Sequence, residues 1–264
     1  MQLFKAHGLG NDYLILEQGP TLDVPTVIAL CDRHRGPGAD GILEPTPTDR
    51  ADHGVRIWNP DGSIAEKSGN GLRILAFWLC RDRSAGDRFS IDTGHEVVSC
   101  EVEGPRIHLE MGRIELIEPA QDPIALEEGP LQITALRVGN PHAVIWTDAP
   151  ALDALPWRSW GRQLEHHPRF PDRTNVQLAR AIKPDHLEAR VWERGAGETQ
   201  ASGSSACAVA AVAVRLGHAR ADVPLSVQMP GGTLQVTVRS DWRVRLEGPV
   251  APVGRFELDR GWSP

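Results

Sequence analysis

The chain has 264 residues, of which 41% are hydrophobic, and a formal net charge of −7. This is enough for a packed core in one large domain or two smaller ones, and the acidic balance excludes a broad nucleic-acid surface, which requires clustered Lys and Arg. The apolar runs are far shorter than the roughly 20 residues of a membrane helix, and no signal-peptide pattern opens the chain, so we expect a cytoplasmic protein without a membrane partner.

The first half is predicted to combine short strands with two helices. Residues 2–6 alternate like a strand, residues 8–12 break the pattern, and residues 13–16 resume it. A helix is expected over residues 24–34, with Pro25 suited to its first turn. Further strands are predicted at residues 55–59, 89–92, 96–102 and 106–111.

The second half repeats this order after a stretch around residues 115–130, whose Glu and Pro content predicts a linker. A helix is expected over residues 152–164. Strands are predicted at residues 131–138, 143–146, 174–180, 186–192, 225–229, 233–238 and 242–246. We therefore expect an α/β (α+β) protein of two similar halves, residues 1–118 and 119–264, with the last strand able to return to the first half.

Two short Ser-Gly loops resemble each other and each opens an apolar, helix-like segment. One spans residues 67–73 and the other residues 201–207, and their serines Ser68 and Ser202 are 202 − 68 = 134 residues apart. A helix N-terminus carries free N–H groups and a positive dipole end, so it can bind an anion. Two such ends facing each other would hold one carboxylate and place both serines on opposite faces of one carbon. The alternative for each serine is a plain helix N-cap.

A set of motifs in order along the chain resembles the diaminopimelate epimerase family from end to end. The matching segments are residues 7–12, 59–63, 69–73, 139–142, 173–175, 193–199, 203–204 and 230–232. The resemblance implies two pseudo-symmetric halves, each a mostly antiparallel sheet wrapped around a central helix, with the active site between them. It also implies a homodimer, a small amino-acid substrate (LL- to meso-diaminopimelate by default) and no cofactor. The four cysteines lack CxxC spacing, so no metal site is expected either.

The sequence departs from the family at the two catalytic positions. Family members use two cysteines for proton transfer at the substrate α-carbon, and these positions map onto Ser68 and Ser202. A thiol has a pKa of about 8.5 and an alcohol lies near the value of about 15.7 for water, a gap on the order of 10 kcal/mol. A lone serine is therefore a poor base, although an adjacent base can assist it. His142 and Glu193 match the family positions that assist the two cysteines.

Three explanations of the serines stay open: an engineered pair of replacements, a natural relative with altered chemistry, and a natural relative that binds an amino acid without turnover. The neighbouring residues favour natural divergence. Lys67 stands where a neutral residue is usual, Ile74 where another cysteine is common, and Ser205 where the second glycine of Gly-Ser-Gly is expected.

The resemblance also implies a substrate-binding set. Its members hold the amino and carboxylate groups or line the two helix ends: Asn11, Asn59, Gly69, Asn70, Asn140, Asn175, Glu193, Arg194, Gly203 and Ser204. Arg194 suits a bidentate grip on a carboxylate, and the alternative for each Asn is a local turn. We predict an amino-acid epimerase or racemase. The alternatives are an isomerase of another amino or hydroxy acid, or of a double bond, in which His142 or Glu193 moves the proton, and a non-catalytic amino-acid-binding protein.

Overall fold

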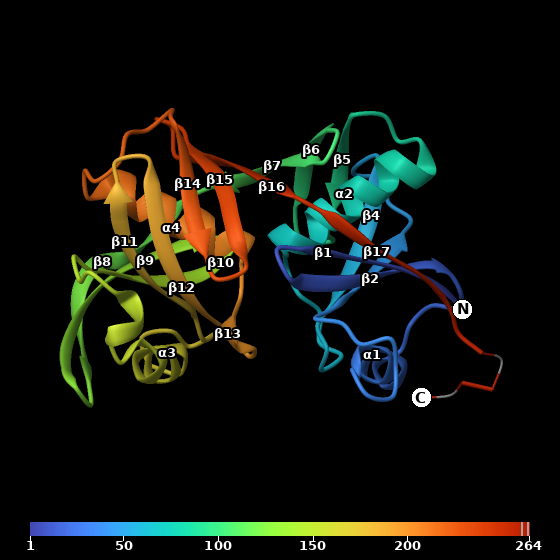
Figure 1. Ribbon diagram of the computed structural model, residues 1–264, viewed down its shortest axis with the longest axis horizontal. Helices are drawn as coiled ribbons and strands as arrows, with labels where there is room; N and C mark the ends of the chain where they lie inside the picture. The colour runs from blue at the N-terminus through green and yellow to red at the C-terminus, as the bar shows by residue number, and fades with distance from the viewer. Residues whose placement is uncertain (260, 263) are drawn as a thin grey trace. The chain divides into compact units, whose positions relative to one another are not determined.

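The computed structural model describes residues 1–259, 261, 262 and 264. It confirms a mixed α+β protein made mostly of strands. The chain forms two compact units, which we call the N-terminal unit (residues 1–109 and 248–264) and the C-terminal unit (residues 110–247). In each unit, strands surround one long helix (Figure 1).

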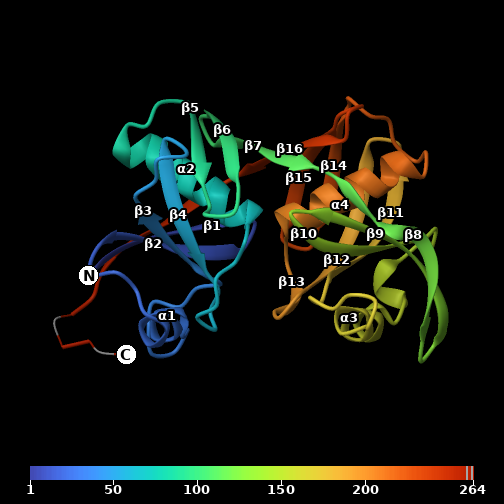
Figure 2. The ribbon, with the colours of Figure 1, turned by 180° about the vertical axis from the view of Figure 1, so that it is seen from behind.

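The N-terminal unit is built around helix α2 (Gly69–Arg83), with the shorter α1 (Val24–Cys31) below it in Figure 2. Its strands are β1 (Gln2–Gly8), β2 (Asn11–Gln18), β3 (Ile42–Thr46), β4 (His53–Trp58), β5 (Arg88–Asp92), β6 (Val97–Glu103), the start of β7 (Arg106–Arg113), and β17 (Ala251–Glu257). Strand β1 pairs antiparallel with both β2 and β17. Strands β2 and β3 run parallel, as do β4 and β5.

The C-terminal unit is built around helix α4 (Gly203–Arg215). It also contains β8 (Glu115–Leu126), β9 (Gly129–Val138), β10 (Asn140–Trp146), the short helix η1 (Leu152–Ala154), α3 (Trp157–Glu165), β11 (Asn175–Lys183), β12 (His186–Glu193), β13 (Gly197–Thr199), β14 (Pro224–Met229), β15 (Gly232–Val238) and β16 (Arg243–Pro249). Strands β10 and β11 run parallel, as do β12 and β14, and the hairpins between consecutive strands are antiparallel.

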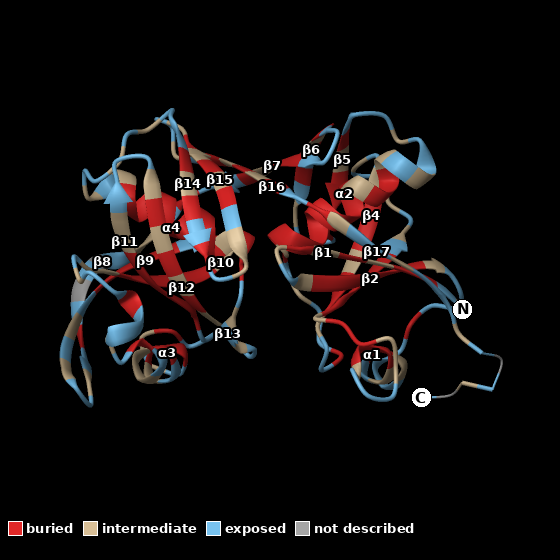
Figure 3. Ribbon diagram, viewed as in Figure 1, coloured by how far each residue is buried: buried red, intermediate tan, exposed pale blue. Residues whose placement is uncertain are grey.

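The two central helices are buried along most of their length, as expected for helices enclosed by sheet (Figure 3). In α2, Leu72 and Ile74 are fully buried. Every residue from Ala206 to Ala213 in α4 is buried, and the helix contacts β9, β10, β11, β12, β14 and β15. Small side chains along α4 let strands approach it closely.

Several predicted elements needed correction. The linker predicted around residues 115–130 is wrong: this stretch forms the hairpin of β8 and β9, in which Leu126 pairs with Gly129. Proline is tolerated where a strand does not need the N–H for a ladder, so a Pro-rich composition did not exclude a strand here. The boundary expected after residue 118 falls within β8. Strands β3, β13 and β17 were not predicted.

Helix limits also differ from prediction. The helix expected over residues 24–34 ends at Cys31, because the carboxylate of Asp32 accepts the backbone N–H groups of His34 and Arg35 and turns the chain. The helix expected over residues 152–164 is divided into η1 and α3, with Pro156 at the N-cap of α3. Within the described residues, no helix is both long and apolar enough to span a membrane.

Candidate active site

Ser68 is the N-cap of α2 in the N-terminal unit. Its Oγ accepts the backbone N–H of Gly71 at 3.0 Å and lies 2.9 Å from the hydroxyl of Tyr13. A Cβ at position 41 would come within 2.5 Å of the Tyr13 ring, so Gly41 makes the room that this ring occupies. Lys67 is buried just before Ser68, and its ammonium group pairs with Glu96 at 3.0 Å.

A polar network anchors the first turn of α2. The Asn70 amide donates to Asn11 Oδ1 at 3.0 Å, and the Asn11 amide donates to Asp40 at 3.0 Å. Arg73 is fully buried, donates to Asn70 Oδ1 at 2.7 Å, and reaches back to the carbonyl of Gly69 at 3.2 Å. Guanidinium and amide groups thereby fix the orientation of two predicted substrate ligands, Asn11 and Asn70.

Asn59 is placed differently from the other predicted ligands of this unit. Its amide donates to Ser63 Oγ at 2.9 Å, and its backbone forms a turn that pairs with Ser63 and Gly62. This is the local turn role that was the alternative for each Asn. Asn11 and Asn70 are therefore hydrogen-bonded to each other. The hydrogen bond of the Asn59 side chain stays within its own turn.

Ser202 is the N-cap of α4 in the C-terminal unit, and its partner is a carboxylate. Its hydroxyl donates to Glu193 Oε2 at 3.1 Å, and Thr199 donates to Glu193 Oε1 at 2.7 Å. Among the described residues, the Ser202 side chain makes no capping hydrogen bond to its helix. The hairpin of β12 and β13 brings Glu193 and Thr199 together, because Glu193 pairs with Gly197 near the turn. Glu193, one of the two residues expected to assist the serines, thus contacts Ser202 directly.

His142 is fully buried on β10 with hydrogen bonds at both ring nitrogens. Its Nε2 lies 2.9 Å from Asn140 Oδ1 and its Nδ1 lies 3.0 Å from the amide nitrogen of Gln177. Burial, together with the nearby charge of Arg194, lowers the pKa of His142 to about 3. The imidazole is therefore neutral at physiological pH. Its contacts orient Asn140.

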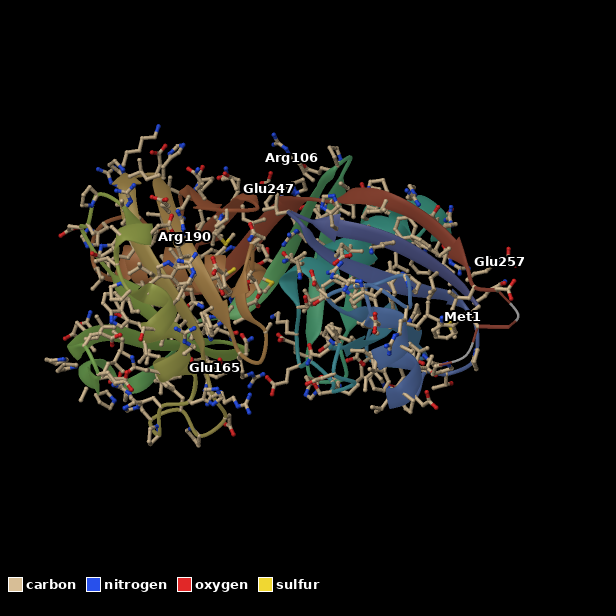
Figure 4. All side chains as sticks on the ribbon, turned by 60° about the horizontal axis from the view of Figure 1, so that its bottom comes forward. Met1, Arg106, Glu165, Arg190, Glu247 and Glu257 are labelled. Carbon is tan, nitrogen blue, oxygen red and sulfur yellow. The ribbon has the colours of Figure 1, made fainter. Side chains whose placement is uncertain are left out.

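Asn175 and Arg194 meet at the start of β11. Asn175 is buried, donates to the carbonyl of Pro141 at 3.1 Å, and accepts the backbone N–H of Arg194 at 3.0 Å. The turn that carries Glu193 and Arg194 is held by Glu165 at the end of α3, labelled in Figure 4, which accepts the N–H of Gly195 at 2.8 Å. Gly203 and Ser204 open α4, as Gly69 and Asn70 open α2.

Three groups at these sites were missed by sequence reasoning: Tyr13, Thr199 and Gln177. Tyr13 carried a signal, since it is the single tyrosine of the chain and directly follows the first motif. Thr199 closes the 193–199 motif, and Gln177 lies two residues after Asn175, on the same face of β11. Within the part of the chain that the structure describes, no group of three or more His, Cys, Asp or Glu residues is arranged to hold a metal ion.

The fold defines the class of protein first. The hydroxyproline epimerase from Agrobacterium vitis, solved with bound trans-4-hydroxy-L-proline, matches with a TM-score of 0.76 at 15% identity, covering 97% of this chain and 91% of that chain. A phenazine biosynthesis protein of the PhzF family from Bacillus anthracis matches with a TM-score of 0.74 at 15% identity, covering 98% of each chain. These proteins share the fold.

The family follows from sequence. The family model for diaminopimelate epimerase matches residues 3–117 and 134–251, and the chain belongs to this family. The diaminopimelate epimerase of Synechococcus elongatus is 37% identical over 281 residues, covering 98% of this chain and 99% of the relative. That of Xanthomonas axonopodis pv. citri is 37% identical over 285 residues, covering 100% and 96%. The predicted family and fold are confirmed.

Proposed function

We propose that this chain is a cofactor-independent amino-acid isomerase of the epimerase and racemase type, with LL-diaminopimelate as its default substrate. Family membership and the names of its relatives support an amino-acid isomerase. The observation that carries the proposal for this chain is the contact between Ser202 and Glu193 at 3.1 Å. It gives an alcohol the adjacent base that a lone serine lacks.

The Ser202–Glu193 pair supplies the base that removes the α-proton. When Ser202 Oγ takes the α-proton of the substrate, its own hydroxyl proton passes to Glu193 Oε2. The C–H bond breaks, a new O–H bond forms on Ser202, and the proton is stored on the carboxylate. A carboxylate can take a proton from a hydroxyl group, so Glu193 is the base of the pair. The hydroxyl of Thr199 holds the other carboxylate oxygen in place.

The Ser68–Tyr13 pair supplies the acid that donates a proton to the substrate. Ser68 Oγ accepts the N–H of Gly71, which stabilises negative charge on that oxygen when it gives up a proton. An ordinary phenol has a pKa of about 10, much nearer to a thiol than an aliphatic alcohol is. Tyr13 can therefore return a proton to Ser68 after Ser68 donates to the substrate, and the cycle closes when Glu193 releases its proton to solvent and Tyr13 takes one from solvent.

The alternative in which His142 moves the proton has less support. Both ring nitrogens of His142 are hydrogen-bonded to other side chains, whereas the carboxyl group of Glu193 contacts Ser202 directly. The homodimer and the cytoplasmic location stay predictions. A small amino acid remains the proposed partner.

Incubation with LL-diaminopimelate in D₂O tests the proposal. We expect slow incorporation of deuterium at the α-carbon together with formation of the meso isomer, both followed by NMR. Absence of both would exclude this substrate.

Restoring both thiols tests whether the rest of the site is that of an epimerase. The double variant Ser68→Cys, Ser202→Cys is expected to increase the rate roughly 10²–10⁴-fold, the usual contribution of a well-matched acid–base group. Ser99→Cys, on the exposed face of β6, is the matched control and should leave the rate unchanged. No gain in the double variant would point to a different substrate.

A further inference from the structure

A chain of buried polar side chains runs from the first turn of α4 to Asn140. The amide nitrogen of Gln177 lies 2.9 Å from Ser205 Oγ and 3.0 Å from His142 Nδ1, and His142 Nε2 lies 2.9 Å from Asn140 Oδ1. Ser205, Gln177 and His142 are each fully buried. Parallel pairing of β10 with β11 places His142 opposite Asn175, so Gln177 lies diagonally across from the imidazole on the same face.

The direction of these hydrogen bonds follows from the environment of the Gln177 amide oxygen. In the described structure, Gln177 Oε1 is buried and has no hydrogen-bond partner. Reversing the amide would bury an unpaired N–H₂ group there instead. Orphaned buried N–H groups are rarer than under-satisfied carbonyl oxygens, so the nitrogen of Gln177 faces His142. Because this nitrogen donates, Nδ1 of His142 accepts, and the ring hydrogen is on Nε2.

We infer that Gln177 and Ser205 are positioning residues: together they hold His142 as the tautomer with its hydrogen on Nε2, which fixes Asn140 with its amide N–H₂ directed away from the ring as a hydrogen-bond donor. Such a donor suits a carboxylate and not an ammonium group. The use of this donor by a substrate rests on the proposed function, whereas the tautomer does not. The inference also explains Ser205, which stands where the family has glycine, since its hydroxyl accepts from Gln177.

The tautomer of His142 is measurable without substrate. Long-range ¹H–¹⁵N correlation spectra of the labelled protein distinguish protonated from unprotonated ring nitrogens, and the His142 signals are assigned by their loss in His142→Asn. We expect a hydrogen on Nε2 and an unprotonated Nδ1 in the wild-type protein at neutral pH. A hydrogen on Nδ1 would overturn the inference.

Gln177→Glu changes the donor into an acceptor at constant shape. We expect the hydrogen of His142 to move to Nδ1, either in the other tautomer or in an imidazolium paired with the new carboxylate. The matched control is Gln235→Glu on β15, where the same Gln-to-Ser contact occurs: Gln235 donates to Ser226 Oγ at 2.9 Å. It should leave the His142 spectrum unchanged. An unprotonated Nδ1 in Gln177→Glu would contradict the inference. If that variant does not fold, Gln177→Leu replaces it, with a mixture of both tautomers expected.

Calorimetry with LL-diaminopimelate separates this inference from the proposed function. In Gln177→Glu we expect roughly tenfold weaker binding or more, the loss of one hydrogen bond to a charged group. If the wild-type protein has the predicted tautomer but does not bind the amino acid, the proposed function fails and the positioning role stands. If Gln177→Glu binds as tightly as wild type despite its changed tautomer, the role assigned to Asn140 is wrong.

Discussion

Ser68 and Ser202 occupy the same position of their helices, directly before the first residue of α2 and of α4, yet their hydroxyl groups have different partners. Ser68 accepts a backbone N–H from its own helix and meets the phenol of Tyr13. Ser202 donates to the carboxylate of Glu193. Helix geometry alone thus does not decide what an N-cap serine does. The neighbouring strand supplies a weak acid in one unit and a base in the other.

This difference distinguishes the chain from an enzyme with two equivalent thiols. Paired thiols exchange roles when the reaction reverses, since either can be the thiolate. Here the two partners differ in kind, because Ser202 contacts a carboxyl group and Ser68 contacts a phenol. We therefore expect removal of the α-proton to depend chiefly on the C-terminal unit.

Glu193→Gln is expected to have the largest effect. Glutamine can still accept the Ser202 hydrogen bond but cannot take its proton, so the rate of α-deuterium incorporation from D₂O should fall roughly 10²–10⁴-fold. Glu198→Gln is the matched control, because Glu198 is paired with Arg158 on the surface, five residues further along. Equal effects of the two variants would show that Glu193 is not the base.

Acidification should affect the two units in different pH ranges. The pKa of His142 is about 3 in the folded protein against an ordinary value of 6.5, so its contribution to stability is present above pH 6.5 and is lost as the pH falls towards 3. At about 1.36 kcal/mol per pH unit, the free energy of unfolding that is lost through His142 amounts to roughly 3 kcal/mol at pH 4. In the N-terminal unit, burial raises the pKa of Asp12, but hydrogen bonds from Arg33 and Lys5 outweigh it and lower the value to about 2, against an ordinary 3.8. The stabilisation from Asp12 therefore persists until the pH falls below 3.8.

We accordingly expect the C-terminal unit to lose protection first between pH 6 and pH 4. Hydrogen exchange followed by mass spectrometry reports each unit through its own peptides. His142→Gln should flatten the response of the C-terminal unit. Simultaneous loss of protection in both units, unchanged by this variant, would contradict the assignment.

The two serines should differ, more modestly, in their contribution to folding. Ser68→Ala removes a capping hydrogen bond and should lower the free energy of unfolding by about 1 kcal/mol. Ser202→Ala removes no such bond in the described structure and should cost less. Urea titrations at pH 7 measure both. A larger loss for Ser202→Ala would mean that its contact with Glu193 outweighs capping.

The sequence supported the main elements of the fold because its strands and central helices have clear periodicity. Prediction from the local sequence pattern failed where the composition of a segment did not match its structure. The stretch at residues 115–130 is rich in Glu and Pro but forms a hairpin, and the exposed Val253 on β17 gave no alternating pattern. Such strands are specified by their pairing partners, which a local pattern does not contain.

Site residues followed a similar division. Motif matches named Asn11, Asn70, Glu193 and Ser202 as site residues, and the structure places Asn11 beside Asn70 and Glu193 beside Ser202. They did not indicate that Tyr13 reaches Ser68, a contact that depends on the absence of a side chain at Gly41. Nor did they indicate that Gln177 and Ser205 contact each other from different elements. Motifs do not indicate contacts that form only when distant segments of the chain pack together.

The pairing of β17 with β1 has a consequence for the order in which the protein folds during synthesis. The ribosome makes β1 before the C-terminal unit and β17 after it, so the N-terminal unit lacks one of its strands until residues 251–257 have emerged. Residues 110–247 form one continuous segment, and their unit has its strands earlier. Although nascent domains generally fold in order from the N-terminus, here the unit made second is the first whose sheet can be complete.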